Sequence, residues 1–345
     1  MESGAQMPIT IKRLSAECGL SVSTVSKALN NYPDVSEQTR AQVRAAAERL
    51  GYHPSAIARG LKIGRTFNLG VLYSDDSESG FTHSYFSPVL ESFKSEAERR
   101  GYDITFITHR MRHTQMTYLE HCRYRNVDGV CLVCCHFDDP EVIELVAGSL
   151  PVVTVDHLFN NRTCVQSENR QGMEELTRHV LEMGHRRIAY IHGSDAAVTD
   201  IRVKSFLRTM GEAGVSVPDE YLVRGWYHDP AKTRSAVERL LDVSPRPTCI
   251  LMSDDYAALG GIEAITARGL RIPQDISVAG FDGVPLLQMC QPRLTTVIQD
   301  TRRIGQEAAR QLVHLIESPR TTFPEILPIP CRLLKGESVA PPASR

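Results

Sequence analysis

Four aspartates directly follow short apolar runs that are typical of strands. They are Asp75 after GVLYS, Asp156 after VVTV, Asp254 after CILMS and Asp282 after VAGF. In doubly wound sheets the ligand crevice lies beyond the carboxyl ends of the strands, where carboxylates can accept hydrogen bonds from ligand hydroxyls. A single aspartate at such a position could equally cap the helix that follows it. Four of them together favour a binding crevice.

Paired carboxylates can also hydrolyse glycosides, and Asp254 is followed directly by Asp255. Neighbouring residues at a strand end point in different directions, so these two are poorly placed to face one glycosidic bond. The sequence contains no Gly-x-Gly-x-x-Gly, Walker-type Gly-Lys-Ser/Thr or Gly-x-Ser-x-Gly motif, and these are the usual signatures of nucleotide binding and serine hydrolysis. We therefore expect neither an enzyme nor a cofactor.

The segment CLVCCH could suggest a metal site, because Cys131 and Cys134 have the Cys-x-x-Cys spacing of zinc ligands. A second pair at a suitable distance is missing. The segment is also a run of small apolar residues, which predicts a buried strand. We expect no bound metal.

The N-terminal segment GLSVSTVSKALNNYPDVSEQTR contains a different kind of site. Thr10, Ser21 and Ser36 are suited to cap three short helices, and Gly19 is suited to end the first. A helix, a tight turn and a second short helix form a helix-turn-helix. The outer face of its second helix would carry Ser23, Ser26 and Lys27, which could contact phosphates or base edges. The alternative is a solvated surface helix.

The distribution of charge supports a polyanionic partner for this region. The chain has 345 residues and a formal net charge of −2, but residues 1–65 contain nine basic and five acidic side chains, a net charge of +4 that leaves −6 for the remainder. A basic head on an acidic body indicates that the head binds nucleic acid.

The remaining chain predicts an α/β fold. Apolar runs such as NLGVLY, DGVCLVC and ISVAGFD alternate with amphipathic helical patterns, which is typical of parallel sheets covered on both faces. We predict a helix-turn-helix domain over 8–52, a hinge helix and linker over 53–66, and two doubly wound Rossmann-like lobes over 67–340. The first lobe would comprise about 67–160 and 295–326, and the second about 161–294 and 327–340.

The start of the chain lacks an apolar signal region, and no run approaches the length needed to span a bilayer. The nine cysteines are scattered without a disulfide framework. We expect a cytoplasmic protein without membrane contact.

Six segments spread over the chain resemble the lactose-repressor/galactose-repressor (LacI/GalR) family of bacterial transcription regulators. They are TIKRLSAECGLSVSTVSKALNN, VSEQTRAQVRAAAERLGYHPSAIARGLKIGRT, HRRIAYIHG, RGLRIPQDISVAGFDG, PRLTTVIQD and ESVAPP. The resemblance implies a homodimer that reads a pseudo-palindromic operator in double-stranded DNA. It also implies a small effector bound between two lobes of the periplasmic-binding-protein type.

The resemblance also implies a role for individual DNA-binding residues. The recognition helix begins at Ser21, and base contacts fall to Val22, Ser23 and Lys27. Phosphate contacts fall to Thr10, Thr24, Ser26, Asn30 and Ser36. Ala58 and Leu61 match the hinge helix at the minor groove, where Leu61 would be the apolar wedge. Many members have arginine in place of Lys27, and lysine is a point donor instead of a planar fork.

For the effector, the resemblance assigns Arg202 as the ligand-holding arginine of the second lobe. It assigns ligand positions to Asp156, Asp254 and Asp282, and aromatic positions to Tyr85, Phe86 and Tyr227, with the sole tryptophan, Trp226, beside the last. Two departures concern the pocket. The connection DDSESGFTHSYF is longer than the usual one, and Val198 stands where a purine-binding relative would have a polar residue. We expect a carbohydrate effector.

Two alternatives share parts of this pattern. A catabolite-type regulator of the same fold would respond to a phosphoprotein partner. A solute-binding protein of a transporter would need a signal peptide and would have no basic helical head. The segment after Pro328 has no heptad repeat, which favours a dimer over a coiled-coil tetramer.

Overall fold

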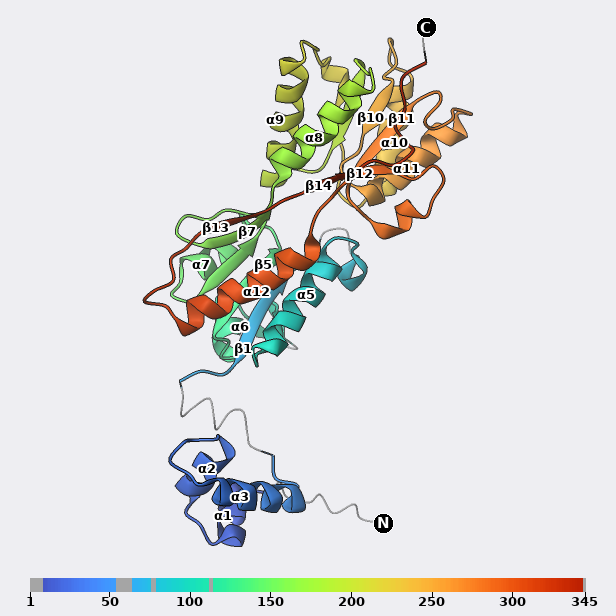
Figure 1. Ribbon diagram of the computed structural model, residues 1–345. Helices are drawn as coiled ribbons and strands as arrows, with labels where there is room; N and C mark the ends of the chain where they lie inside the picture. Colours follow the sequence, from blue (N-terminus) through green and yellow to red (C-terminus); the bar gives the residue numbers. More distant parts are fainter. Residues whose placement is uncertain (1–8, 54–63, 76–78, 112–113, 344–345) are drawn as a thin grey trace. The chain divides into compact units, whose positions relative to one another are not determined.

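The structure is a computed structural model that describes residues 9–53, 64–75, 79–111 and 114–343 (Figure 1). The chain divides into two compact units, Met1–Phe67 and Asn68–Arg345. The boundary between linker and body therefore lies within one residue of the predicted one. The predicted hinge helix, with Pro54, Ala58 and Leu61, lies outside the described residues.

The described part of the head contains the three helices predicted for it, α1 (Ile11–Cys18), α2 (Val22–Leu29) and α3 (Glu37–Leu50). The three predicted caps are confirmed. Thr10, Ser21 and Ser36 each accept a hydrogen bond from a backbone N–H in the first turn of the helix that follows. Gly19 ends α1 in the left-handed conformation with φ of 65°, which glycine adopts without a steric penalty.

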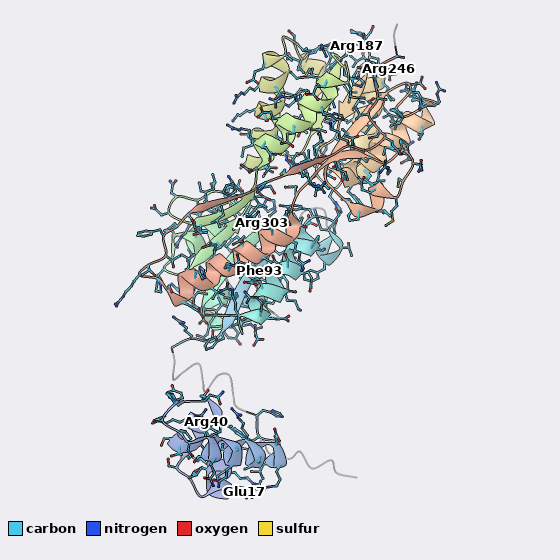
Figure 2. The ribbon with its side chains drawn as sticks, in the orientation of Figure 1. Glu17, Arg40, Phe93, Arg187, Arg246 and Arg303 are labelled. Carbon is cyan, nitrogen blue, oxygen red and sulfur yellow. The ribbon has the colours of Figure 1, made fainter. Side chains whose placement is uncertain are left out.

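The head has its own small core. Leu14 and Val43 are fully buried, and Val25 and Ala28 pack between them from α2. Truncating a fully buried leucine to alanine costs roughly 2–5 kcal/mol, so Leu14 contributes much of the stability of so small a unit. Arg40 reaches back from α3 to the carbonyl oxygen of Val35, with Nε and Nη2 at 3.1 and 2.9 Å, and so fixes the turn before α3 (Figure 2).

The body contains two six-stranded sheets, which confirms the predicted pair of doubly wound lobes. The first sheet is parallel throughout, with the order β13-β7-β6-β5-β1-β2. Its strands are β1 (Asn68–Tyr73), β2 (Asp103–Ile107), β5 (Gly129–Cys134), β6 (Val152–Val155), β7 (Thr163–Ser167) and β13 (Ile326–Ile329). Its helices are α5 (Phe86–Arg99), α6 (Tyr118–Tyr124), α7 (Pro140–Ala147) and α12 (Thr301–Glu317). A short hairpin, β3 (Arg110–Met111) with β4 (Thr114–Gln115), follows β2.

The second sheet has the order β14-β12-β11-β10-β8-β9, and only β14 is antiparallel to its neighbour. Its strands are β8 (Ile188–His192), β9 (Leu222–Arg224), β10 (Cys249–Leu251), β11 (Ser277–Asp282), β12 (Thr295–Ile298) and β14 (Arg332–Leu334). Its helices are α8 (Asn169–Glu182), α9 (Ala197–Glu212), α10 (Pro230–Leu241) and α11 (Asp255–Ala267). Three 3-10 turns complete the body, η1 (Gly80–Thr82), η2 (Asp219–Tyr221) and η3 (Pro285–Gln288).

Strand pairing corrects the predicted lobe boundaries in three places. β7 and β13 pair with each other in the first sheet, with Cys164 opposite Ile326, although the prediction assigned residues 161–167 and 327–329 to the second lobe. β12 pairs with β11 in the second sheet, with Thr295 opposite Ala279, although it was predicted in the first lobe. These short apolar segments could extend either sheet, so the tertiary register decides their place. The chain therefore crosses between lobes after β7, β12 and β13.

Side chains of successive residues point to opposite faces of each sheet. In the first lobe, Leu72, Val130 and Val152 face α6 and α7. In the second, Ile250 and Val278 face α10 and α11, whereas Tyr190 and Phe281 face α8 and α9. The first four residues of CLVCCH, Cys131–Cys134, lie in the strand β5, as predicted, and burial raises the pKa of the Cys131 thiol. No described helix is long and apolar enough to cross a membrane.

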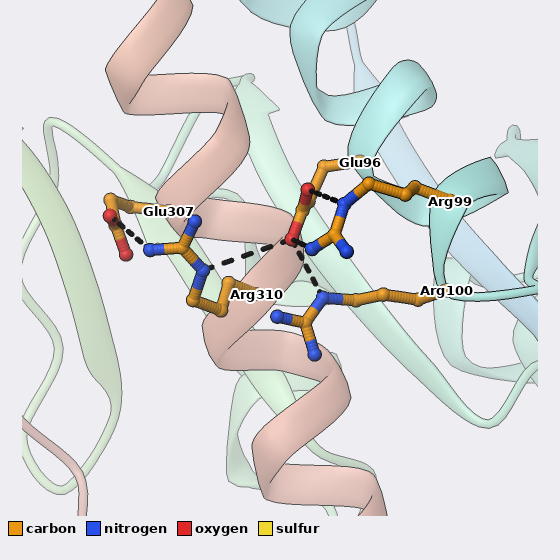
Figure 3. A network of polar contacts seen from close by, with 5 residues as sticks. All are labelled: Glu96, Arg99, Arg100, Glu307 and Arg310. Carbon is orange, nitrogen blue, oxygen red and sulfur yellow. Dashed lines mark hydrogen bonds and ion pairs between the residues drawn. The ribbon is translucent and has the colours of Figure 1, made fainter.

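Helices α5 and α12 lie side by side on the other face of the first sheet (Figure 1). Gly305 permits this close approach, because a Cβ there would lie 2.1 Å from Ser92 Oγ. Above the contact, the buried Glu96 carboxylate accepts hydrogen bonds of 2.7 Å from Arg99 Nη2 and Arg100 Nε, and Arg310 Nε of α12 lies at 3.7 Å (Figure 3). Mainly the Arg99 hydrogen bond lowers the pKa of Glu96 to about 2.

Replacing Glu96 by glutamine should destabilise the body by roughly 1–3 kcal/mol at pH 7, because hydrogen bonds to a buried charged group are lost. The folded-state pKa is lowered, so this contribution is present above the unfolded value and is lost as pH falls toward about 2. Urea unfolding followed by circular dichroism at pH 7 and pH 3 measures it. Glu98→Gln on the same helix, in an exposed pair with Lys94, is the matched control and should have little effect. Equal midpoints for the two variants at pH 7 would contradict the role of Glu96.

Candidate functional site

The recognition helix α2 buries one face and exposes the other. Val25 and Ala28 pack into the head, whereas Ser21, Val22 and Ser23 are exposed. The Ser21 hydroxyl lies 2.8 Å from the hydroxyls of both Ser23 and Thr24. A short helix that exposes small polar side chains along one face has the shape needed to enter a major groove.

The other predicted DNA-binding side chains lie at helix ends. Thr10 and Ser36 are exposed at the N-termini of α1 and α3, where free backbone N–H groups and the helix dipole favour a phosphate. Asn30 ends α2 and donates from Nδ2 to the carbonyl oxygen of Ser26 at 2.7 Å. Ala58 and Leu61 lie outside the described residues.

Lys27 has an intramolecular partner that the sequence analysis did not identify. Its ammonium pairs with the Asp34 carboxylate, across the turn that follows α2. Both side chains are partly exposed, and the hydrogen bond from Lys27 lowers the pKa of Asp34. An exposed pair of this kind contributes little to stability because water and salt screen it, so Lys27 can exchange Asp34 for a base or a phosphate at small cost.

In the second lobe, Arg202 of α9 is buried at the carboxyl end of the sheet. Its Nε donates to Asn169 Oδ1 at 2.7 Å and its Nη1 donates to the Ser253 carbonyl oxygen at 3.2 Å. The guanidinium carbon lies 3.6 Å from the centroid of the Phe281 ring. Burial alone would lower the pKa of Arg202, but Tyr227 and Asp282 raise it, so the group stays charged.

Asp282 ends β11 beside this arginine, with a strained φ of 109°. Its Oδ1 accepts a hydrogen bond from Gln299 Nε2 at 2.7 Å. Burial, and secondarily Asp254, raises the pKa of Asp282 well above its ordinary value, whereas Arg202 opposes the shift. Among the described residues, Asp282 Oδ2 and Arg202 Nη2 have no hydrogen-bond partner. The Asp282 Oδ2 acceptor and the N–H groups of Arg202 Nη2 therefore remain for a ligand.

The two neighbouring aromatic residues, Trp226 and Tyr227, face different environments. The Tyr227 hydroxyl lies 2.8 Å from Thr199 Oγ1, and Arg202 lies 5.8 Å from the ring centroid. Gly193 makes room for this ring, because a Cβ there would lie 2.1 Å from it. Trp226 is 40% exposed and its ring lies 4.4 Å from Lys232 Nζ. Tyr227 thus joins the Arg202 group and Trp226 does not.

The Asp156 carboxylate forms the corresponding group in the first lobe. It accepts hydrogen bonds from the Tyr85 hydroxyl at 2.5 Å and from the Ser167 backbone N–H at 2.8 Å. Burial raises the pKa of Asp156, and these two hydrogen bonds oppose the shift. Phe86 packs edge-on against Tyr73, with ring centroids 5.7 Å apart.

The remaining two strand-end aspartates mainly organise the backbone. Asp254 Oδ1 accepts the Ala257 N–H at 2.7 Å as the cap of α11, and Oδ2 accepts the His228 N–H at 2.9 Å. Asp75 Oδ2 accepts the Ser79 N–H at 3.1 Å. Asp254 therefore caps the helix that follows its strand, which is the alternative considered above for a single strand-end aspartate.

Several residues around these groups were not found from the sequence. Among the described residues, Tyr190, Ser167 and Gln299 each bury a side-chain oxygen without a hydrogen-bond partner. Gln299 contacts Asp282, and Tyr190 lies close enough to Arg202 and Tyr227 to influence their charges. Unpaired buried polar atoms are costly, so these atoms are candidate ligand contacts. Ser167 and Gln299 lie at strand ends, which is their only sequence signal, whereas Tyr190 lies in the middle of β8.

Comparison with known proteins supports both the DNA-binding head and the body of two lobes. The model of the bacterial regulatory proteins of the lacI family matches residues 10–55, and that of a periplasmic binding protein-like domain matches residues 177–339. The HTH-type transcriptional repressor PurR of Pectobacterium atrosepticum is 33% identical over 338 residues, which cover 96% of this chain and 97% of the relative. PurR of Proteus mirabilis is also 33% identical, with the same coverage. The chain belongs to the LacI/GalR family.

Solved structures give the same result for the fold. A complex of the transcriptional regulator CelR with cellobiose matches with a TM-score of 0.70 and 27% identity, over 96% of this chain and 99% of that one. The lac repressor dimer bound to operator and the anti-inducer ONPF matches with a TM-score of 0.80 over 97% and 100%, and at 23% identity it shows the fold alone. This LacI-family member is a DNA-binding transcriptional repressor.

Lys27→Ala should weaken binding to the preferred operator about tenfold and relax the choice at one base pair of each half-site, because a base contact is removed. The operator is first obtained by selecting from a randomised duplex library with the wild-type repressor, and affinities are then measured by fluorescence anisotropy. Lys12→Ala, which removes an exposed lysine from α1, is the control. It should lower affinity without changing the preferred sequence. If Lys27→Ala kept the wild-type base preference, Lys27 would not be a residue that contacts bases.

Proposed function

We propose that this repressor binds a pseudo-palindromic operator as a homodimer and is controlled by a small carbohydrate bound between its lobes. The observation that supports the effector class is the group formed by Arg202, Asp282 and Tyr227. It offers the Arg202 Nη2 donors and the Asp282 Oδ2 acceptor beside an aromatic ring. Sugar hydroxyls both donate and accept hydrogen bonds, and the C–H face of a sugar ring packs on an aromatic side chain.

The relatives bear on this proposal in different ways. CelR, which resembles this chain over almost its whole length, has been solved with cellobiose. Val198 at the start of α9 offers no hydrogen bond to a ligand, which favours a sugar over a nucleobase. A nucleobase therefore enters the test below as the competing effector.

The dimer is supported by apolar side chains left exposed on the second lobe. In and just after η3, Leu286 is 63% exposed and Met289 is 81% exposed. Exposed apolar side chains of this size favour association with another protein surface. A second copy of the chain is the occupant that a pseudo-palindromic operator requires, because half-sites related by a dyad need two heads.

We propose that the protein has no catalytic activity of its own. Asp255 is fully buried, and it accepts hydrogen bonds from Thr296 Oγ1 at 2.6 Å and from the Val284 N–H at 2.7 Å. Burial raises the pKa of Asp255 to about 7. Asp254 caps α11. The adjacent carboxylates are therefore engaged in the fold instead of facing one glycosidic bond.

The proposed mechanism links two sites through one movable element. An effector that contacts residues of both lobes stabilises one relative position of the lobes, and that position sets the spacing of the two heads on DNA. Such coupling is reciprocal, so operator binding changes effector affinity by the same factor. Because the protein binds DNA, we propose that it acts in the cytoplasm.

A carbohydrate effector should raise the unfolding temperature of the protein. At about a hundred times its dissociation constant it adds roughly 2.7 kcal/mol, and differential scanning fluorimetry against sugars, sugar phosphates and nucleobases detects it. Arg202→Lys should abolish the shift while operator affinity is unchanged, because lysine keeps the charge but loses the planar fork. Arg208→Lys, in an exposed pair with Glu212 on the same helix, is the matched control and should keep the shift.

The outcomes of this panel separate the candidates. A shift with a nucleobase and with no sugar would replace the carbohydrate by a base. If no compound shifted the midpoint, a phosphoprotein partner would become the better candidate for control. A shift that survived in Arg202→Lys would move the effector away from Arg202.

A further inference from the structure

Three flat side chains stack across the boundary between the lobes. His83 precedes α5 of the first lobe, His228 follows β9 of the second, and Tyr256 lies in the first turn of α11. The His83 and His228 ring centroids are 4.1 Å apart with planes inclined by 15°, and those of His228 and Tyr256 are 3.8 Å apart with planes inclined by 17°. Both histidines are buried, at 7% and 9% exposure.

Hydrogen bonding fixes the protonation state of His83. Its Nδ1 accepts the backbone N–H groups of Tyr85 at 3.2 Å and of Phe86 at 3.3 Å. A ring nitrogen that accepts hydrogen bonds carries no proton, so the imidazole is neutral with its proton on Nε2. A proton on Nδ1 would point at two other N–H groups and would break both contacts. In this arrangement His83 cannot become charged without leaving its position.

The second imidazole reinforces this preference for the neutral form. Burial, and then His228, lowers the pKa of His83 to about 4, and Asp75 opposes the shift. Burial also lowers the pKa of His228, against the opposing effects of Asp254 and Asp75. Among the described residues, the ionisable groups that face the pair are the Asp75 and Asp254 carboxylates, one from each lobe, and Tyr256. Two imidazolium rings at this separation would repel each other.

The stack is continuous with the effector site on both sides. His83 is followed two residues later by Tyr85, which donates to Asp156. His228 directly follows Tyr227, and its backbone N–H is held by Asp254. Any displacement of the two rings therefore moves residues assigned to the effector.

We propose that His83, His228 and Tyr256 form an interlobe histidine latch, which holds the lobes in this arrangement while both imidazoles are neutral and releases them on acidification. The latch would make the response of the repressor to its effector depend on pH. This inference rests on the proposed effector site between the lobes.

The sign of the effect follows from linkage. The pKa values are lowered in the latched state, so the latch is fully stable above the ordinary histidine value of about 6.5 and weakens as pH falls below it. In the proposed latch the stacked arrangement is the one that binds the effector, so effector affinity is highest near neutral pH. Between pH 7.5 and pH 5.5 it should fall by about tenfold for each histidine that must lose its proton to latch.

The first experiment needs no effector. The fluorescence of Trp226, the sole tryptophan and two residues from His228, is recorded for the full chain from pH 8 to pH 4. A transition between about 6.5 and 4 is expected in the wild type. His83→Asn keeps an acceptor for the Tyr85 and Phe86 N–H groups but does not titrate, and His228→Phe keeps a flat ring. Each should diminish or abolish the transition.

His185→Asn is the matched control. His185 is also a buried histidine of the second lobe, and burial lowers its pKa, but it contacts Thr248 and Ala340 instead of the other lobe. This variant should retain the wild-type transition. A transition that persisted in both His83→Asn and His228→Phe, or that vanished only in His185→Asn, would overturn the latch.

The second experiment measures affinity for the sugar found in the panel by calorimetry at pH 7.5 and pH 5.5. The wild type should lose affinity on acidification, and both latch variants should lose much less. Equal wild-type affinity at the two pH values would overturn the latch and leave the carbohydrate proposal standing. A Trp226 transition that depends on both histidines, in a protein that binds no sugar, would sustain the latch and refute the carbohydrate proposal.

Discussion

The buried guanidinium of Arg202 organises the carboxyl end of the second sheet. A charge removed from water must be paired and hydrogen-bonded to be tolerated. Arg202 meets this requirement by contacting Asn169 at the start of α8, the Ser253 carbonyl after β10 and the Phe281 ring of β11. It thereby fixes the ends of three elements relative to α9. Next to this group lie the Asp282 carboxylate, the 225–228 segment and the Tyr227 ring.

Some of the strand-end carboxylates hold the backbone, and others are available to bind a ligand. Asp156 joins two parts of the first lobe through Tyr85 and Ser167, and Asp254 joins α11 to His228. Among the described residues, Asp282 keeps Oδ2 without a hydrogen-bond partner, and Arg202 opposes the rise that burial causes in its pKa. The same residue type in equivalent positions thus holds the backbone at Asp75 and Asp254, whereas Asp156 and Asp282 are the proposed effector contacts. Burial and available N–H groups decide which role each takes.

The head is stabilised by local interactions that do not use the side chains of its DNA-binding surface strongly. Side-chain caps at Thr10, Ser21 and Ser36 satisfy the helix starts, and a core around Leu14 and Val43 joins the three helices. The pair of Lys27 and Asp34 is exposed and weak. Weak pairing suits a DNA-binding surface, because its hydrogen-bond donors must exchange their protein partners for DNA with little loss of free energy.

The sequence by itself determined the architecture and the identity of the head. The helix caps, the Gly19 stop and the apolar runs of β1, β5 and β11 are local patterns, and each forms the predicted element because neighbouring residues alone decide it. Family motifs then assigned the function as a LacI-type repressor. The tertiary structure decided that the chain crosses between lobes after β7, β12 and β13. It also decided that Tyr227 packs near Arg202 whereas Trp226 does not, and which residues surround Gln299, Tyr190 and the stacked histidines. These depend on which distant segments pair and which polar atoms become buried together, and no local pattern of residues encodes that.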